Sequence, residues 1–190
     1  MLTGGCLELG AESLPFAPFT AVLRELVRDL GAAGVAALLS GEAGQVHSRF
    51  AEVIAADPAL VLPGRTAGEQ ARHWQAAHDM PRALVSAWQA ASQAGRTLAY
   101  AEQLAMLSRV LELWEQVPDA AERIGAGHVA VLEEAIRPAE LAGEDDRGLS
   151  LTQAALREVD AATEPVRAAL LLRNRGYLKH HLGRTEDTAP

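Results

Sequence analysis

Residues 66–114 read TAGEQARHWQAAHDMPRALVSAWQAASQAGRTLAYAEQLAMLSRVLELW, and this stretch decides the fold. It predicts a helix, a tight turn, a second helix, a short break and a third helix. Thr66 and Glu69 have the spacing of a capping box, in which a hydroxyl residue precedes the helix and a glutamate three residues later reaches back. Pro81 follows the turn at Asp79, and proline suits the first turn of a helix although it interrupts an established one.

Apolar and small residues recur at helical spacing within each of the three segments. The three stripes are Ala67, Ala71, Trp74 and His78, then Leu84, Trp88, Ala91 and Gly95, then Leu104, Leu107, Leu111 and Trp114. Large side chains fill the space between helices, and small ones allow the helices to approach closely. This combination is typical of stacked helical hairpins, which present a surface for holding a partner.

The rest of the chain continues the same pattern. Further stripes are Val46, Phe50, Val53 and Ile54, then Val129, Leu132, Ile136 and Ala139, with a kink or an early break expected at Pro138. A last helix is expected from about Glu164 to Leu182, opening with Pro165. The turn at 77–84 matches the turn at 142–149 position by position, and residues 181–184 resemble the start of a third. These matches predict a weak repeat of helical hairpins without a true C-terminal cap.

We therefore expect an all-α fold of tetratricopeptide-like stacked helical hairpins. Residues 45–190 form the predicted helical-repeat region. Residues 1–44 differ in character, with many glycines, a short apolar element at 6–9 that suits a strand, and an amphipathic helix near 19–30. We interpret residues 1–44 as a small, partly ordered segment left from another domain.

Composition excludes several classes of protein. The 190 residues carry a formal net charge of −8, which disfavours a nucleic-acid surface. A single cysteine, Cys6, rules out an internal disulfide framework and suits a reducing compartment. No segment has the roughly 20 apolar residues that cross a bilayer, and no signal peptide is evident, so we expect a cytoplasmic protein. The local basic cluster at 173–184 is interpreted as the solvated face of a terminal helix.

No constellation of catalytic, cofactor-binding or metal-ligating residues emerges, and we expect a protein that is not an enzyme and has no cofactor. The segment 41–48 has Val46 and His47 where a phosphate-binding P-loop needs glycine and lysine. The six histidines lack zinc-site spacing, and His47 and His128 are expected to stand alone. The acidic residues Glu133 and Glu134 are expected on solvated helix faces. Cys6 is interpreted as a buried thiol.

Two blocks of sequence nevertheless resemble a known family. The first comprises Gly4–Gly10, Leu14–Phe19 and Leu26–Arg28; the second comprises Phe50–Glu52, Asp57–Leu60, Ala71–Asp79, Ala99–Glu102, Leu111–Trp114 and Val117–Arg123. The first block resembles the segment after the P-loop helix in large ATP-binding LuxR-type transcriptional regulators, relatives of the maltose regulator in the STAND class of AAA-like ATPases. The second resembles the same family's junction with its tetratricopeptide-like helical region.

The resemblance implies that residues 1–44 are a remnant of an ATPase-domain segment. It also implies a truncated or internally deleted regulator, because the P-loop, the remaining ATPase core and the DNA-binding helix-turn-helix have no counterparts here. We expect a non-catalytic interaction module that holds a protein partner or a small inducer in a helical groove, without direct nucleic-acid or membrane binding. The alternatives are a regulator that still binds ATP or DNA, and a relic without function.

Overall fold

The computed structural model describes residues 24, 27–28, 31, 43–62 and 64–184, and within these ranges all regular structure is helical. The expected all-α fold of stacked hairpins is therefore confirmed. The apolar element at 6–9, Cys6 and the first block of the family resemblance, apart from Val27 and Arg28, lie outside the described residues. The chain divides into two compact units, Met1–His78 and Asp79–Pro190. This division falls inside the predicted repeat region 45–190, while the boundary predicted near residue 44 stays a prediction.

The described part of the first unit contains helix α2 (Ala43–Ala56), the 3₁₀ turn η1 (Pro58–Leu60) and helix α3 (Thr66–Ala76). Its apolar core is Phe50, Val53, Ile54 and Val61, with Val46 packed against it. Phe50, Val53 and Ile54 of the predicted α2 stripe are thus buried, and Val46 is partly buried. On α3, Ala67, Ala71 and Trp74 are buried, whereas His78 lies beyond the helix end in a left-handed conformation with φ 60°.

The predicted capping box at Thr66 is wrong. Arg65 is the N-cap residue, and no side chain caps the helix. The Arg65 N–H donates to the carbonyl oxygen of Leu62 over 3.0 Å, and the Arg65 carbonyl already accepts from Glu69 over 3.0 Å. The preceding loop therefore turns directly into the helix, and Thr66 is its first helical residue.

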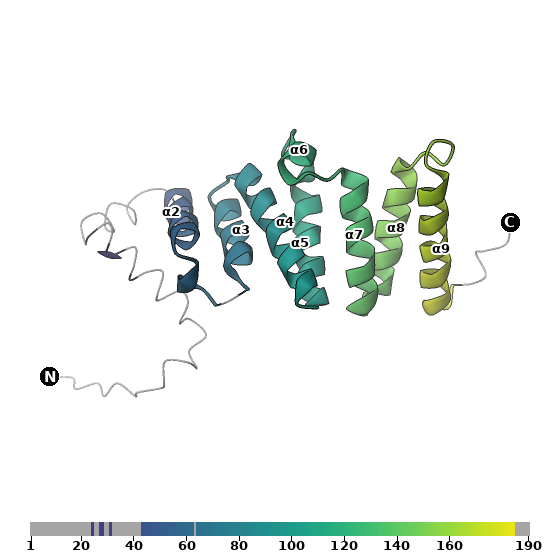
Figure 1. Ribbon diagram of the computed structural model, residues 1–190, viewed down its shortest axis with the longest axis horizontal. Helices are drawn as coiled ribbons and strands as arrows, with labels where there is room; N and C mark the ends of the chain where they lie inside the picture. Colours follow the sequence, from purple (N-terminus) through teal and green to yellow (C-terminus); the bar gives the residue numbers. More distant parts are fainter. Residues whose placement is uncertain (1–23, 25–26, 29–30, 32–42, 63, 185–190) are drawn as a thin grey trace, which may run out of the picture. The chain divides into compact units, whose positions relative to one another are not determined.

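The second unit is a row of antiparallel helices (Figure 1). They are α4 (Met80–Arg96), α5 (Tyr100–Trp114), the short α6 (Ala120–Ile124), α7 (His128–Leu141), α8 (Asp145–Glu158) and α9 (Pro165–His181). Each long helix packs against the next one along the chain. Proline lies in the first turn of α4 and begins α9, as predicted, and the Asp79 carboxylate caps α4 by accepting the Arg82 N–H over 3.0 Å.

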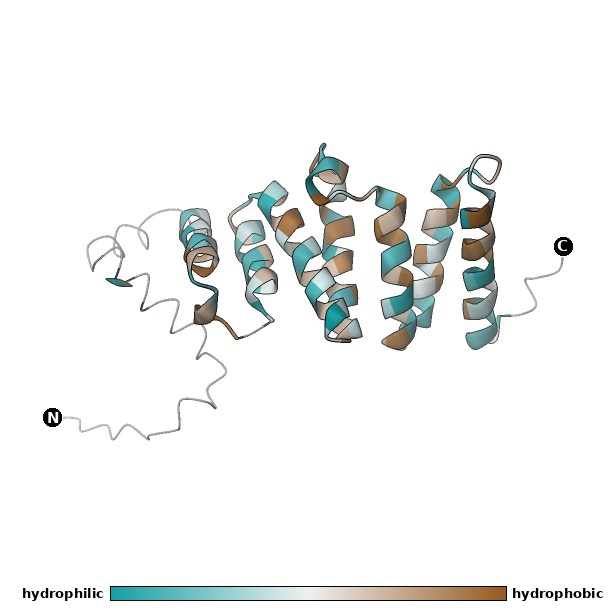
Figure 2. Ribbon diagram, viewed as in Figure 1, coloured by the Kyte–Doolittle hydropathy of each residue, from teal (hydrophilic) through white to brown (hydrophobic). Residues whose placement is uncertain are grey.

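Small side chains at the contacts bring these helices close together. Completely buried alanines on α4, α7 and α8 face a core of fully buried leucines: Ala83, Ala87, Ala135, Ala139 and Ala155 with Leu84, Leu104, Leu107 and Leu113. Figure 2 shows apolar and polar residues alternating along each helix, as an amphipathic arrangement requires. Of the three tryptophans on the predicted stripes, Trp74 is buried, whereas Trp88 and Trp114 are only half-buried.

The predicted early break at Pro138 does not occur, since α7 continues through it to Leu141. Proline lacks one backbone donor, but its carbonyl still accepts the Ala142 N–H over 2.9 Å, so the last turn closes. None of the described helices is long and apolar enough to cross a membrane.

Candidate binding groove

A cavity of about 670 Å³ lies among α4, α5 and α7. Its walls come from the C-terminal half of α4, the α4–α5 turn, the first turns of α5 and the middle of α7 up to Pro138. The lining residues are Ser92, Gly95, Arg96, Leu98, Tyr100, Gln103, Glu133, Glu134, Arg137 and Pro138. Polar groups and apolar surface are therefore combined in one hollow, which is the usual make-up of a binding site.

Gln103 is the buried polar residue of this lining. Its side chain is 7% exposed, and its Nε2 donates to the Glu134 carboxylate over 3.4 Å, which joins α5 to α7. On the other side it lies against Gly95 of α4, where an added Cβ would come within 2.8 Å of Nε2. Glycine at position 95 thus makes room for the amide. The Gln103 amide carries donors and an acceptor with which a ligand can bond.

Two cations, Arg96 on α4 and Arg137 on α7, border the hollow, and both are exposed. Neither forms an ion pair within 4 Å among the described residues. Of the two carboxylates beside them, Glu133 is bound by Arg167, and Glu134 accepts a hydrogen bond from Gln103. The two arginines are therefore available to an incoming anion, and a guanidinium can hold a carboxylate through two parallel hydrogen bonds.

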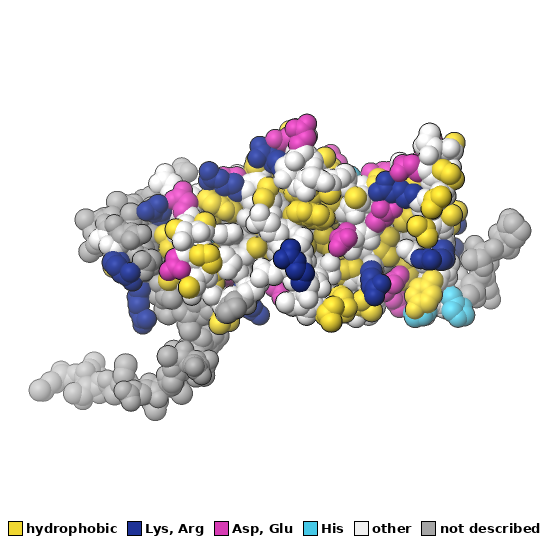
Figure 3. Space-filling view, viewed as in Figure 1, with side chains coloured by type: hydrophobic (Ala, Val, Ile, Leu, Met, Phe, Trp, Pro, Cys, Tyr) yellow, Lys and Arg dark blue, Asp and Glu magenta, His cyan; other side chains and the backbone are white. Residues whose placement is uncertain are grey.

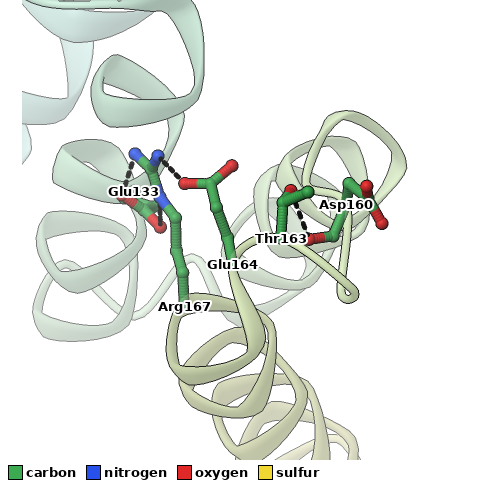
Figure 4. A network of polar contacts seen from close by, with 5 residues as sticks. All are labelled: Glu133, Asp160, Thr163, Glu164 and Arg167. Atoms are coloured by element: carbon green, nitrogen blue, oxygen red, sulfur yellow. Dashed lines mark hydrogen bonds and ion pairs between the residues drawn. The ribbon is translucent and has the colours of Figure 1, made fainter.

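Arg167 of α9 binds the Glu133 carboxylate of α7 through two parallel hydrogen bonds (Figure 4). The Nε and Nη2 atoms of Arg167 each donate to a Glu133 oxygen over 2.8 Å, and Nη1 donates to Glu164 over 2.8 Å. These hydrogen bonds raise the pKa of the Arg167 guanidinium, first through Glu133 and then through Glu164. The expectation that Glu133 is simply solvated is wrong, since α9 supplies a cation that the sequence separation of 34 residues conceals.

A second polar cluster lies in the first unit, between α2 and α3. His47 Nδ1 and His73 Nδ1 are 2.8 Å apart, and the His73 ring also stacks on Phe50 with ring centroids 5.2 Å apart. Burial, followed by the charge of Arg72 and then by His47, lowers the pKa of His73 to about 4. His73 is thus neutral near pH 7, and one ring donates to the other.

The expectation that His47 and His128 stand alone is therefore wrong. His128 Nδ1 bonds the Glu158 carboxylate at 2.8 Å, and its ring packs on Trp114 with centroids 5.0 Å apart. The partners lie 26 and 30 residues away in sequence, so no spacing rule could show them. Both pairs tie neighbouring helices together, as structural histidines do.

The segment tested for phosphate binding is helical where the structure describes it. Residues 43–48 belong to α2, and the Ser48 hydroxyl donates to the Gly44 carbonyl over 3.1 Å. A cradle of outward-pointing N–H groups is therefore not formed by these residues. Among the described residues, no group of three or more histidine, cysteine or acidic side chains could hold a metal ion.

Comparisons with protein-family models, curated proteins and solved structures gave no match. The assignment of a function consequently rests on the groove itself.

Proposed function

We propose that the chain is a non-catalytic interaction module of the helical-repeat kind, and that the groove among α4, α5 and α7 binds a protein segment carrying a carboxylate. The observation that carries the proposal is the pair Arg96 and Arg137, two unpaired guanidinium groups flanking a hollow whose own carboxylates are engaged.

The shape of the hollow supports a peptide as the ligand. Leu98 and Tyr100 offer apolar surface beside the arginines, and the Gln103 amide can bond with a peptide backbone. The lining contains no histidine, cysteine, lysine or aspartate. A regulatory role, as a module derived from a LuxR-type regulator, is the prediction that the sequence resemblance adds.

The test uses random dodecapeptides displayed on phage and selected on the full chain. We expect enrichment of peptides rich in aspartate and glutamate. The affinity of the leading synthetic peptide, measured by calorimetry, should fall at least tenfold in the R96E/R137E variant, which corresponds to about 1.4 kcal/mol. An R157E variant is the control, because Arg157 is an exposed cation on α8 outside the groove, and it should bind within twofold of the parent.

Equal binding by the parent and by R96E/R137E would overturn the proposal, as would a selection that yields no acidic peptide. A free dicarboxylate such as glutarate, tested in the same calorimeter, distinguishes a small inducer from a peptide. Tighter binding of glutarate than of the peptide would contradict a peptide site.

A further inference from the structure

The turn between α4 and α5 holds a leucine in a backbone conformation that glycine normally takes. Leu98 has φ 58°, in the left-handed region, where the Cβ of any residue other than glycine crowds the following carbonyl oxygen. Among the described residues, His78 with φ 60° is the one other non-glycine residue in this region. Leu98 is also 67% exposed, so its side chain gains little from burial. The leucine therefore strains the backbone without adding to the core.

Two other helices of the second unit end in the same hydrogen-bond pattern, but with glycine. At the end of α4, the Leu98 N–H donates to the Gly95 carbonyl over 3.2 Å, and the next N–H along the chain donates to the Ala94 carbonyl over 2.9 Å. This pair of bonds forms a Schellman motif, which places a left-handed residue just after the helix. Helices α7 and α9 close with the same two bonds, and their left-handed residues are Gly143, with φ 76°, and Gly183, with φ 67°. The turn itself therefore does not require a leucine.

Exposure alone would not distinguish this leucine. The space-filling view shows hydrophobic side chains set among basic and acidic ones on the visible face of the second unit (Figure 3), and scattered apolar side chains are ordinary on protein surfaces. Leu98 differs because its exposure coincides with a left-handed backbone and with a place in the lining of the groove. Strained backbone conformations are concentrated at binding and catalytic sites. The combination indicates that the Leu98 side chain serves a ligand.

The neighbours of Leu98 define the chemistry of that ligand. Arg96 stands two positions before Leu98, and Tyr100 stands two positions after it, and all three line the groove. Two residues of an extended peptide span at most about 7 Å. Ligand groups that contact Arg96 and Leu98 together therefore come from residues that are adjacent or one residue apart. A carboxylate for the arginine is thus accompanied by an apolar side chain for the leucine.

We propose that Leu98 determines the specificity of the groove, by selecting peptides in which a large apolar side chain lies within two positions of an aspartate or glutamate. The apolar side chain covers Leu98, while the carboxylate reaches Arg96 and Arg137. Burial of the exposed leucine by the ligand then stabilises the complex, which a glycine at this position could not do. This inference rests on the function proposed for the groove and names the class of peptide that the groove takes.

The first test needs no ligand. L98G relieves the strained conformation, so the thermal midpoint of the full chain, followed by circular dichroism, should rise by a few degrees. L98A keeps the Cβ and with it the strain, so its midpoint should stay close to that of the parent. A lower midpoint in L98G would show that the leucine serves the fold, and it would overturn the proposal.

The second test is a thermodynamic cycle on the leading acidic peptide from the phage selection. The peptide is made in two forms, one with its own large apolar residue beside the acidic one and one with serine there. Calorimetry should show that the serine form binds the parent at least fivefold more weakly than the original form. The two forms should bind L98G within twofold of each other, because the contact that distinguishes them is absent.

A matched control keeps the groove intact. H78G makes the same kind of change at the other left-handed residue, since His78 is exposed and lies outside the groove lining. H78G should bind the original peptide within twofold of the parent and keep the fivefold preference over the serine form. Loss of the preference in H78G would overturn the proposal, because the effect would then not belong to Leu98.

The outcomes separate this inference from the function on which it rests. Equal binding of the two peptide forms by the parent, or an unchanged preference in L98G, would overturn the role of Leu98 alone. A leading peptide without a large apolar residue within two positions of an acidic one would do the same. Equal binding by R96E/R137E would overturn both proposals. Self-association of the chain in sedimentation, if abolished by L98G, would overturn the inference in favour of a second copy.

Discussion

The two units differ in the polar groups that they bury beside an apolar core. Between α2 and α3, the described part of the first unit buries His73 beside His47 and Phe50, and the buried polar atoms without a hydrogen-bond partner, Arg49 Nε and Gln75 Oε1, also lie there. The second unit buries mainly alanine, leucine and valine. Two of its buried hydroxyls, those of Ser108 and Thr152, donate to carbonyls one helical turn earlier, over 2.6 and 2.8 Å.

Because of this difference, the stability of each unit should be sensitive to a different kind of perturbation. An apolar core of closely packed small residues depends on volume, so its weak point is a cavity. A core that includes a neutral histidine depends on protonation, so its weak point is acid. A cavity should therefore destabilise the second unit most, and acid should destabilise the first.

The largest effect is expected from L107A in the second unit. Leu107 is completely buried, so its truncation leaves a cavity and should lower the free energy of unfolding by about 2–5 kcal/mol. Urea denaturation followed by circular dichroism measures this loss. The matched control is L172A on α9, where the side chain is 47% exposed and the loss should stay below about 1 kcal/mol. Similar losses in the two variants would contradict the difference in burial between the two leucines.

The second prediction concerns acid and the first unit. The pKa of His73 is lowered to about 4 in the folded state from 6.5 in the unfolded chain, so between these values the unfolded state binds more protons. The stability of this unit should be complete above pH 6.5, fall as the pH drops towards 4, and then level off. The shift corresponds to at most about 3 kcal/mol.

Trp74 fluorescence in a W88F/W114F background reports this unit, because Trp74 is the tryptophan of α3. In an H73Q variant, which has no titrating ring at this position, the stability should change much less between pH 7 and 4. An equal pH dependence in the parent and in H73Q would refute the role of His73. The loss caused by L107A, measured at pH 7 and at pH 4.5, should stay constant.

A smaller effect is expected from weakening the ion pair between Arg167 of α9 and Glu133 of α7. R167K keeps the charge but loses the paired geometry on Glu133, and it should cost about 1 kcal/mol, since the pair is partly exposed. Hydrogen exchange of α9 amides should accelerate about fivefold, while exchange in α4 and α5 should stay unchanged. A uniform acceleration of hydrogen exchange across the second unit would contradict a local stabilisation of α9 by this ion pair.

The smallest effect on stability is expected from G95A. Alanine favours helix by about 0.5–1 kcal/mol over glycine, but its Cβ would push the flexible end of Gln103 aside. The two effects oppose each other, so the thermal midpoint should change by only a few degrees. Binding of the selected acidic peptide should nevertheless weaken severalfold, as calorimetry can measure. G68A, where an added Cβ meets nothing within 4 Å, is the control.

The helices could be predicted from the sequence, because amphipathic spacing is a local property. Leu84, Leu107 and Leu132, which lie on three of the predicted stripes, are buried, and Pro165 opens α9 as expected. The predicted cap at Thr66 is wrong, because the course of the preceding loop, and not the residue pattern, sets where α3 begins.

The candidate groove could not be predicted in the same way. Gln103 meets Glu134 across 31 residues, and Arg167 meets Glu133 across 34. Nothing in the spacing of these residues indicates which helices become neighbours, so the choice of partners follows only from packing. The signal that could have helped is Gly95 at the end of a helical stripe, since a glycine within a helix often marks a close approach.

The most direct test of the groove is a ¹⁵N–¹H spectrum of the full chain titrated with the selected acidic peptide. The side-chain amide of Gln103 and the Nε–H groups of Arg96 and Arg137 should show the largest shift changes, because they line the hollow. Unchanged Gln103 and Arg96 signals, with the main changes on α9 or in the first unit, would contradict the account.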